Sequence, residues 1–108
     1  MDLMNEYKKI ILKVKEKTNN EQDKIYSLEE EELFEYLWSV ILIKRSTDTL
    51  YNYISKPMIR NLIAKIKSNE PPRDLGAYIK GMAISQKKRE EEYSERIKKK
   101  NKKYWWMD

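Results

Sequence analysis

The feature that most constrains how this chain folds is the stretch from Leu33 to Ile43, where apolar side chains are denser than anywhere else in the sequence. On a helix these residues would occupy two roughly opposite stripes, and a helix that is apolar nearly all round is one surrounded by other elements. Four glutamates at 29–32 precede the stretch, and Lys44 and Arg45 follow it. A helix dipole favours this order of charges. The stretch is therefore expected to lie at the centre of the fold.

The start of this central helix is predicted from Ser27 and Glu30, which have the spacing of a capping box. In that motif the serine hydroxyl accepts from the backbone N–H three residues on, and the glutamate reaches back to the serine N–H. We therefore predict a helix from Ser27 to Arg45. A buried strand over residues 38–43 is the alternative, because periodicity does not separate helix from strand over so short a run.

The composition excludes several classes of function. The 108 residues have the length of one domain and include neither cysteine nor histidine, which removes disulfides, thiolate or imidazole metal sites and the usual general base. The sequence also lacks a glycine-rich phosphate loop and a nucleophile elbow. We therefore expect a protein that is not an enzyme and has no cofactor, metal or small-molecule substrate. No apolar run approaches the length of a transmembrane segment and no signal peptide is evident, so a cytoplasmic location is the expectation.

Charge is distributed unevenly along the chain, whose net charge is +5. Residues 1–45 carry 8 Lys and Arg against 10 Asp and Glu, a net charge of −2, whereas residues 46–108 carry 15 against 8, a net charge of +7. A basic half of this kind indicates a contact surface for a polyanion. Lysine-rich solvated helix faces are the alternative explanation.

Apolar periodicity predicts further helices on both sides of the central one. Leu3 to Val14 has the pattern of an amphipathic helix, whereas residues 18–24 have none and are predicted to form a loop. Residues 46–48 offer caps for a short helix over residues 50–54. A helix is then expected to resume at Pro57, because proline is disfavoured inside a helix but tolerated in its first turn.

The helix that begins at Pro57 is expected to run to about Ser68 with an apolar back. The residues on its opposite side are Pro57, Arg60, Asn61, Ala64, Lys65 and Ser68.

Residues 47–66 resemble helix-turn-helix DNA-binding domains, in which two short helices are joined by a tight turn and the second enters the major groove. The resemblance implies that Arg60 bonds guanine, Asn61 bonds adenine and Lys65 bonds guanine or phosphate. The glycine often found in the turn is replaced by Ser-Lys-Pro at 55–57. Any helical hairpin in a small bundle would also have an apolar back and a polar front, so that reading stays open. The remaining cations expected to hold phosphate are Lys56, Lys67, Lys80 and the lysines of the C-terminal segment.

Residues 75–84 are predicted to form a helix capped by Asp74. A short β-hairpin, placed as the wing of a winged helix, is the alternative. The sequence Ala-Tyr-Ile-Lys-Gly at 77–81 is similar to segments near the C-termini of phage and plasmid replication proteins of the DnaD type. This similarity implies an origin in a mobile element.

The C-terminal segment is basic and ends in aromatic residues. It is expected to be a charged helix or a disordered arm that gains order on a nucleic acid. Its aromatic end is expected to pack on the core or on a second copy, with base stacking, partner docking or a membrane surface as alternatives. The residues concerned are Lys98, Lys99, Lys100, Lys102 and Lys103, then Tyr104, Trp105 and Trp106.

Together these patterns predict a mainly α domain of four or five helices at residues 1–85, with a charged helix or arm at 86–108. The expected function is binding of duplex DNA, as a dimer, by an accessory or regulatory protein of a mobile element. Replication, conjugative transfer and transcription are the candidate processes. The alternative is a non-enzymatic helical adaptor that binds another protein of the replication, transfer or secretion machinery through its aromatic C-terminal end or an exposed helix face.

Overall fold

The structure is a computed structural model that describes the backbone of residues 3–106 and the side chains of residues 3–95. The described residues form five α-helices and one short 3-10 helix, and no strand occurs among them. The mainly α fold class is therefore confirmed. In chain order the elements are α1 (Leu3–Thr18), α2 (Gln22–Tyr26), α3 (Glu30–Arg45), η1 (Thr49–Tyr53), α4 (Lys56–Ile66) and α5 (Leu75–Trp106).

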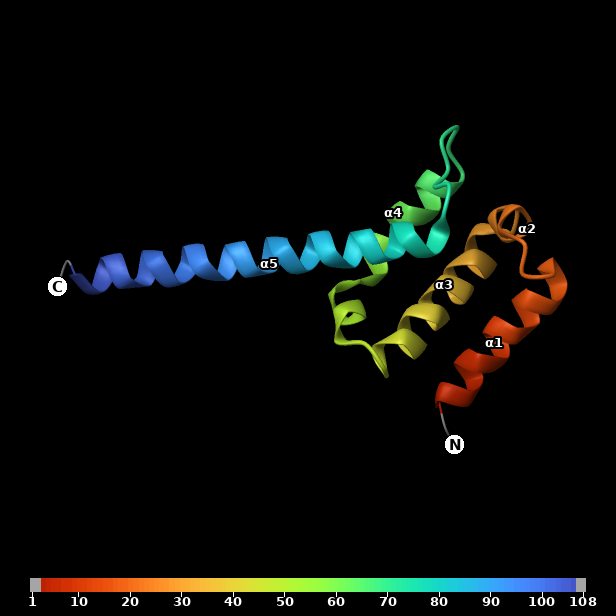
Figure 1. Ribbon diagram of the computed structural model, residues 1–108, viewed down its shortest axis with the longest axis horizontal. Helices are drawn as coiled ribbons and strands as arrows, with labels where there is room; N and C mark the ends of the chain where they lie inside the picture. Colours follow the sequence, from red (N-terminus) through yellow and green to blue (C-terminus); the bar gives the residue numbers. More distant parts are fainter. Residues whose placement is uncertain (1–2, 107–108) are drawn as a thin grey trace.

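Helix α3 is the centre of the fold. It packs against α1, η1 and α4, and α5 packs against η1. In Figure 1, α1 and α3 lie side by side, and α5 crosses the body near α4 before projecting far beyond it. The side chains of Leu33, Leu37 and Ile41 on α3 are completely buried, as expected for an apolar helix surrounded by other elements. The prediction that this stretch organises the fold is confirmed, and the strand alternative at 38–43 is wrong.

The predicted start of the central helix at Ser27 is wrong. Helix α3 begins at Glu30, with Glu29 as its N-cap and without a side-chain cap hydrogen bond. Ser27 instead ends α2, and its hydroxyl donates to the Lys24 carbonyl oxygen at 2.8 Å. The apolar residues Ile25 and Tyr26 explain the difference, because both are buried in the core and form their own short helix. The loop predicted at residues 18–24 is correspondingly shorter, since α2 already begins at Gln22.

The turn after α1 requires left-handed backbone. Asn19 and Asn20 have φ values of 54° and 57°, a conformation that asparagine tolerates better than most residues. The Asn20 N–H donates to the Lys15 carbonyl oxygen at 3.0 Å, which is the long hydrogen bond of a Schellman helix end. The two asparagines thereby reverse the chain and bring α2 back onto the core.

Two elements after α3 begin at caps that the sequence predicts. The Asp48 carboxylate accepts from the Leu50 N–H at 2.9 Å at the start of η1, and the Asp74 carboxylate accepts from the Ala77 N–H at 3.2 Å at the start of α5. Helix α4 begins at Lys56, with proline in its first turn as expected. Residues 75–84 form the first turns of α5, so the hairpin alternative is not what the structure has there. The helix continues without a break through residue 86, where the sequence suggested a boundary between domain and arm.

Candidate nucleic-acid interface

Helix α4 is the element that the sequence singles out for DNA. Its apolar side is buried through Ile59, Leu62, Ile63 and Ile66, which fixes the helix on the core and leaves the other side exposed. The helix contains three basic residues and no acidic residue. An exposed helix surface with this composition favours a polyanion.

Arg60 does not stand free on this exposed side. Its guanidinium lies 3.9 Å from the centroid of the Phe34 ring and forms an ion pair with Glu31 at 3.1 Å, both residues belonging to α3. The side chains of Arg60 and Glu31 are 51% and 80% exposed. Ion pairs this exposed contribute little to stability, so a nucleic acid could compete for the guanidinium at small cost.

Lys67, which was expected to contact phosphate, holds two parts of the fold together. Its ammonium donates to the Tyr26 carbonyl oxygen at 2.7 Å and to the Leu28 carbonyl oxygen, at the end of α2. The Tyr26 hydroxyl donates in turn to the Pro72 carbonyl oxygen at 2.9 Å. Burial, followed by the nearby carboxylates of Asp74 and Asp23, raises the pKa of Tyr26, so the hydroxyl keeps its proton for this bond.

Replacing Lys67 by methionine tests this structural role. We expect Lys67→Met to lower the free energy of unfolding by about 2 kcal/mol, because two carbonyl oxygens lose a charged donor. The measurement is urea denaturation followed by circular dichroism. Lys13→Met, which changes an exposed lysine of α1, is the matched control and should stay within about 0.5 kcal/mol of the unchanged protein. An unchanged midpoint together with weaker DNA binding would instead assign Lys67 to the interface.

Of the remaining predicted contacts of α4, Lys56 and Asn61 are exposed and Lys65 is half-buried. The Lys56 ammonium lies 5.5 Å from the centroid of the Trp38 ring, and that of Lys65 lies 5.8 Å from that of Tyr78. Asn61 is exposed and lines a hollow of about 500 Å³ between α4 and α5, together with Arg89. The structure therefore brings Asn61 and Arg89 to one hollow, with Lys65 beside it near the ring of Tyr78, although the sequence had not pointed to the arginine.

The other predicted contacts lie away from this hollow. Lys80 is exposed on α5 but does not line the hollow. The side chains of the C-terminal segment lie outside the described residues, and only their backbone is placed, in α5. These residues are Lys98, Lys99, Lys100, Lys102, Lys103, Tyr104, Trp105 and Trp106.

No family model, curated protein or solved structure matches this chain. Within the residues that the structure describes, no helix is both long and apolar enough to cross a bilayer. The same residues contain no group of three His, Cys, Asp or Glu side chains placed to hold a metal ion.

A second hollow lies on a different side of the core and was missed by the sequence reasoning. It is a groove of about 710 Å³ between α1, α3 and the first turns of α5. The signal that could have found it is Leu12, which stands off the apolar stripe of its helix and is 56% exposed. A large apolar side chain left in solvent beside further apolar residues indicates a binding surface.

Proposed function

We propose that the protein is a non-enzymatic DNA-binding protein that contacts duplex DNA through α4. The observation that carries the proposal is that α4 has no acidic residue and bears Asn61 and the half-buried Lys65 on the side near α5, with the exposed Lys56 at its first turn on the side near α3. Arg89 from α5 extends the same surface. The role of accessory or regulatory protein in a mobile element rests on the similarity of residues 77–81 to replication proteins of the DnaD type.

The side chains on this surface have the chemistry for both readout and positioning. The Asn61 amide can bond the N6 and N7 atoms of adenine, and the Lys65 ammonium can bond guanine or phosphate. Lys56, at the start of the helix, is suited to phosphate. Arg60 joins them on release from Glu31, because a phosphate or guanine replaces the partner that it loses. The basic segment at 98–103 adds sequence-independent attraction.

The experiment is fluorescence anisotropy of labelled duplexes of about 20 base pairs, titrated with the full chain between about 50 and about 200 mM salt. We expect Asn61→Ala combined with Lys65→Ala to weaken duplex binding by about tenfold or more. The slope of log affinity against log salt concentration should fall by about one, the value for loss of one phosphate contact. Lys13→Ala is the matched control, since it removes an exposed lysine of α1 and should change the affinity by about twofold at most.

Glutamine substitution of Lys98, Lys99 and Lys100 separates DNA binding by α4 from DNA binding by the basic C-terminal segment. If α4 is the interface, this triple variant keeps a residual affinity that still depends on Asn61 and Lys65. If the α4 variant binds like the control and the triple variant loses all binding, the contact belongs to the C-terminal segment and the α4 proposal fails. A single-stranded oligonucleotide that binds as tightly as the duplex would also contradict major-groove contact.

Capture of a protein partner through Tyr104, Trp105 and Trp106 is the alternative function. Their side chains lie outside the described residues, so no described contact favours that location. The apolar groove beside α1 is a second candidate surface for binding a protein.

A further inference from the structure

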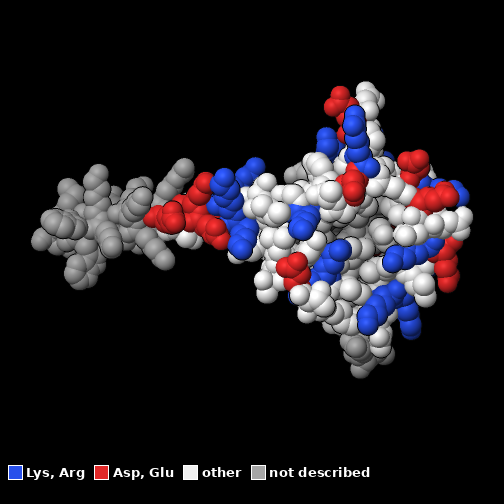
Figure 2. Space-filling model, in the orientation of Figure 1, with Lys and Arg blue, Asp and Glu red and all other residues white. Residues whose placement is uncertain are grey.

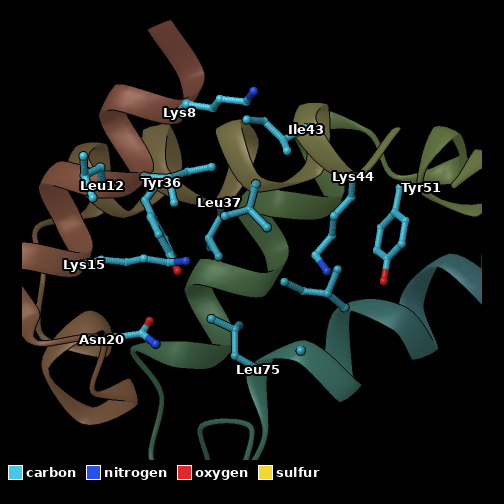
Figure 3. Close-up of a pocket in the computed structure, with 14 residues that line it drawn as sticks. Lys8, Leu12, Lys15, Asn20, Tyr36, Leu37, Ile43, Lys44, Tyr51 and Leu75 are labelled. Atoms are coloured by element: carbon cyan, nitrogen blue, oxygen red, sulfur yellow. The ribbon is translucent and has the colours of Figure 1, made fainter. Parts of the chain in front are cut away.

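The groove between α1, α3 and α5 is apolar at its floor and basic at its rim. Figure 3 shows Leu12, Tyr36 and Leu37 in the groove, with Lys8, Lys15 and Lys44 around it. The other residues that line it are Ile11, Asn20, Val40, Ile43, Tyr51, Leu75, Gly76 and Ile79. None of the described lining residues is acidic.

We propose that this groove docks an acidic amphipathic helix of a partner protein. The inference goes beyond DNA binding and does not depend on it, because none of the α4 residues lines the groove. An apolar groove between helices takes an amphipathic helix through side chains at positions i, i+3, i+4 and i+7. A helix laid over α3 would cover the exposed Leu12 and the half-buried Val40 and Ile43.

Charge complementarity selects an acidic occupant. Among the described residues, none of the three rim lysines Lys8, Lys15 and Lys44 forms an ion pair with a carboxylate. Figure 2 shows Lys and Arg side chains gathered over α1 and α3 on this face, with most acidic side chains toward its edges and along α5. Lys8 and Lys15 are seven residues apart on α1, about 10.5 Å along the helix axis. They match two carboxylates seven residues apart on one edge of a docked helix.

The chain's own C-terminal part fits this groove poorly. Residues 96–103 carry six basic residues and no acidic one, so they have the same sign of charge as the rim. The acidic run at 90–95 has the right sign, but Ile84 and Tyr93 are the exposed apolar residues in that region. Nine residues apart on a helix of about 3.6 residues per turn, these two point in opposite directions. Between residues 84 and 95, where the structure describes the side chains of α5, a second copy therefore offers no exposed apolar stripe to fill the groove. Charge complementarity favours a separate, acidic partner protein.

A lysine-rimmed apolar groove also suits an anionic amphiphile, which the test has to separate from a helix. The groove is open to solvent on its outer side, whereas small-molecule sites bury most of the ligand surface. This openness favours an occupant that covers the groove from outside.

The probe is a synthetic peptide of about 18 residues, five helical turns, with leucines on one face and glutamates on both edges. A matched peptide carries lysine in place of every glutamate. Binding of each fluorescent peptide to the full chain is measured by anisotropy. We expect the glutamate peptide to bind and the lysine peptide to bind at least tenfold more weakly, because the rim lysines attract one and repel the other.

Variants of α1 locate the contact. Lys8→Glu combined with Lys15→Glu should weaken the glutamate peptide by about tenfold and strengthen the lysine peptide. The matched control is Lys9→Glu combined with Lys13→Glu, which makes the same change in net charge on the same helix at exposed residues that do not line the groove. Leu12→Asn should weaken both peptides, and circular dichroism should show an unchanged fold because this side chain is already more than half exposed.

Equal binding of the two peptides, or equal effects of the two double variants, would overturn the proposal. Binding of dodecanoate or of phosphatidylglycerol vesicles without binding of the glutamate peptide would overturn it in favour of an amphiphile site. Failure at this groove leaves the α4 proposal intact, since loss of duplex binding in the Asn61 and Lys65 variant is measured separately.

Discussion

Leu33→Ala is expected to lower the free energy of unfolding by about 3 kcal/mol. Leu33 lies near the start of α3, is completely buried and belongs to the continuous core of the domain. Truncation removes its transfer free energy and leaves a cavity, because the surrounding helices can only partly collapse into the space. The loss is large against the total of about 5 to 15 kcal/mol that holds a typical domain together. The measurement is urea denaturation followed by circular dichroism. The slope of the free energy of unfolding against urea concentration is compared between variants.

The matched control is Leu3→Ala, the same chemical change on α1 at a side chain that is 65% exposed. It should alter the free energy of unfolding by about 0.5 kcal/mol or less. Similar losses for the two variants would mean that α3 is not the centre of the core. For Leu33→Ala we expect a lower urea concentration at the midpoint of unfolding and an unchanged dependence of the free energy on urea concentration.

Arg45→Met is expected to cost about 3 kcal/mol, because the guanidinium joins α3 to the segment that leads into α4. It donates to the Tyr51 carbonyl oxygen at 3.2 Å and to the Ile54 carbonyl oxygen at 2.6 Å. It also stacks over the Trp38 ring at 5.0 Å from the ring centroid. Hydrogen bonds from a charged donor contribute more than neutral ones, and loss of the donor leaves two carbonyl oxygens to find other partners.

Arg45→Lys gives the sharper version of this test. Lysine keeps the charge but does not reproduce the planar fork that reaches both carbonyl oxygens, so we expect about half of the loss to remain. Lys13→Met, at the exposed lysine of α1, is the control and should be nearly neutral. If Arg45→Lys is as stable as the unchanged protein, charge alone accounts for the role of Arg45 and the fork geometry does not matter.

Much of this fold follows from local signals in the sequence. The apolar density of Leu33 to Ile43 predicts a buried helix, and the carboxylates of Asp48 and Asp74 predict the two caps that the structure has. Proline at 57 predicts the start of α4 within one residue. These signals succeed because each acts within a few residues of the position that it determines.

The failures arise where tertiary packing decides between local options. Ser27 can cap the helix that follows it or end the helix that precedes it. The burial of Ile25 and Tyr26 stabilises a helix before Ser27, so the serine ends α2. By contrast, the helix predicted at residues 75–84 agrees with the structure, in which Ile79 and Ala83 are buried on one side of α5.

In the candidate site, too, local features are predicted from the sequence and tertiary contacts are not. The sequence predicts which residues of α4 are opposite its apolar side, but it does not predict that Glu31 and Phe34 hold Arg60 or that Lys67 reaches the end of α2. These contacts join residues far apart in the chain. The apolar groove beside Leu12 also depends on three helices coming together, and periodicity within one helix does not report it.

The most direct test of the central claim is nuclear magnetic resonance of the isotope-labelled full chain, titrated with duplex DNA. If α4 is the interface, the largest changes in amide chemical shift fall on α4 around Asn61 and Lys65 and on the facing turns of α5 at Arg89. Amides of α1 around Leu12 should then stay nearly constant. Shifts concentrated on α1, or confined to residues beyond Ser94 with α4 unchanged, would contradict DNA binding through α4.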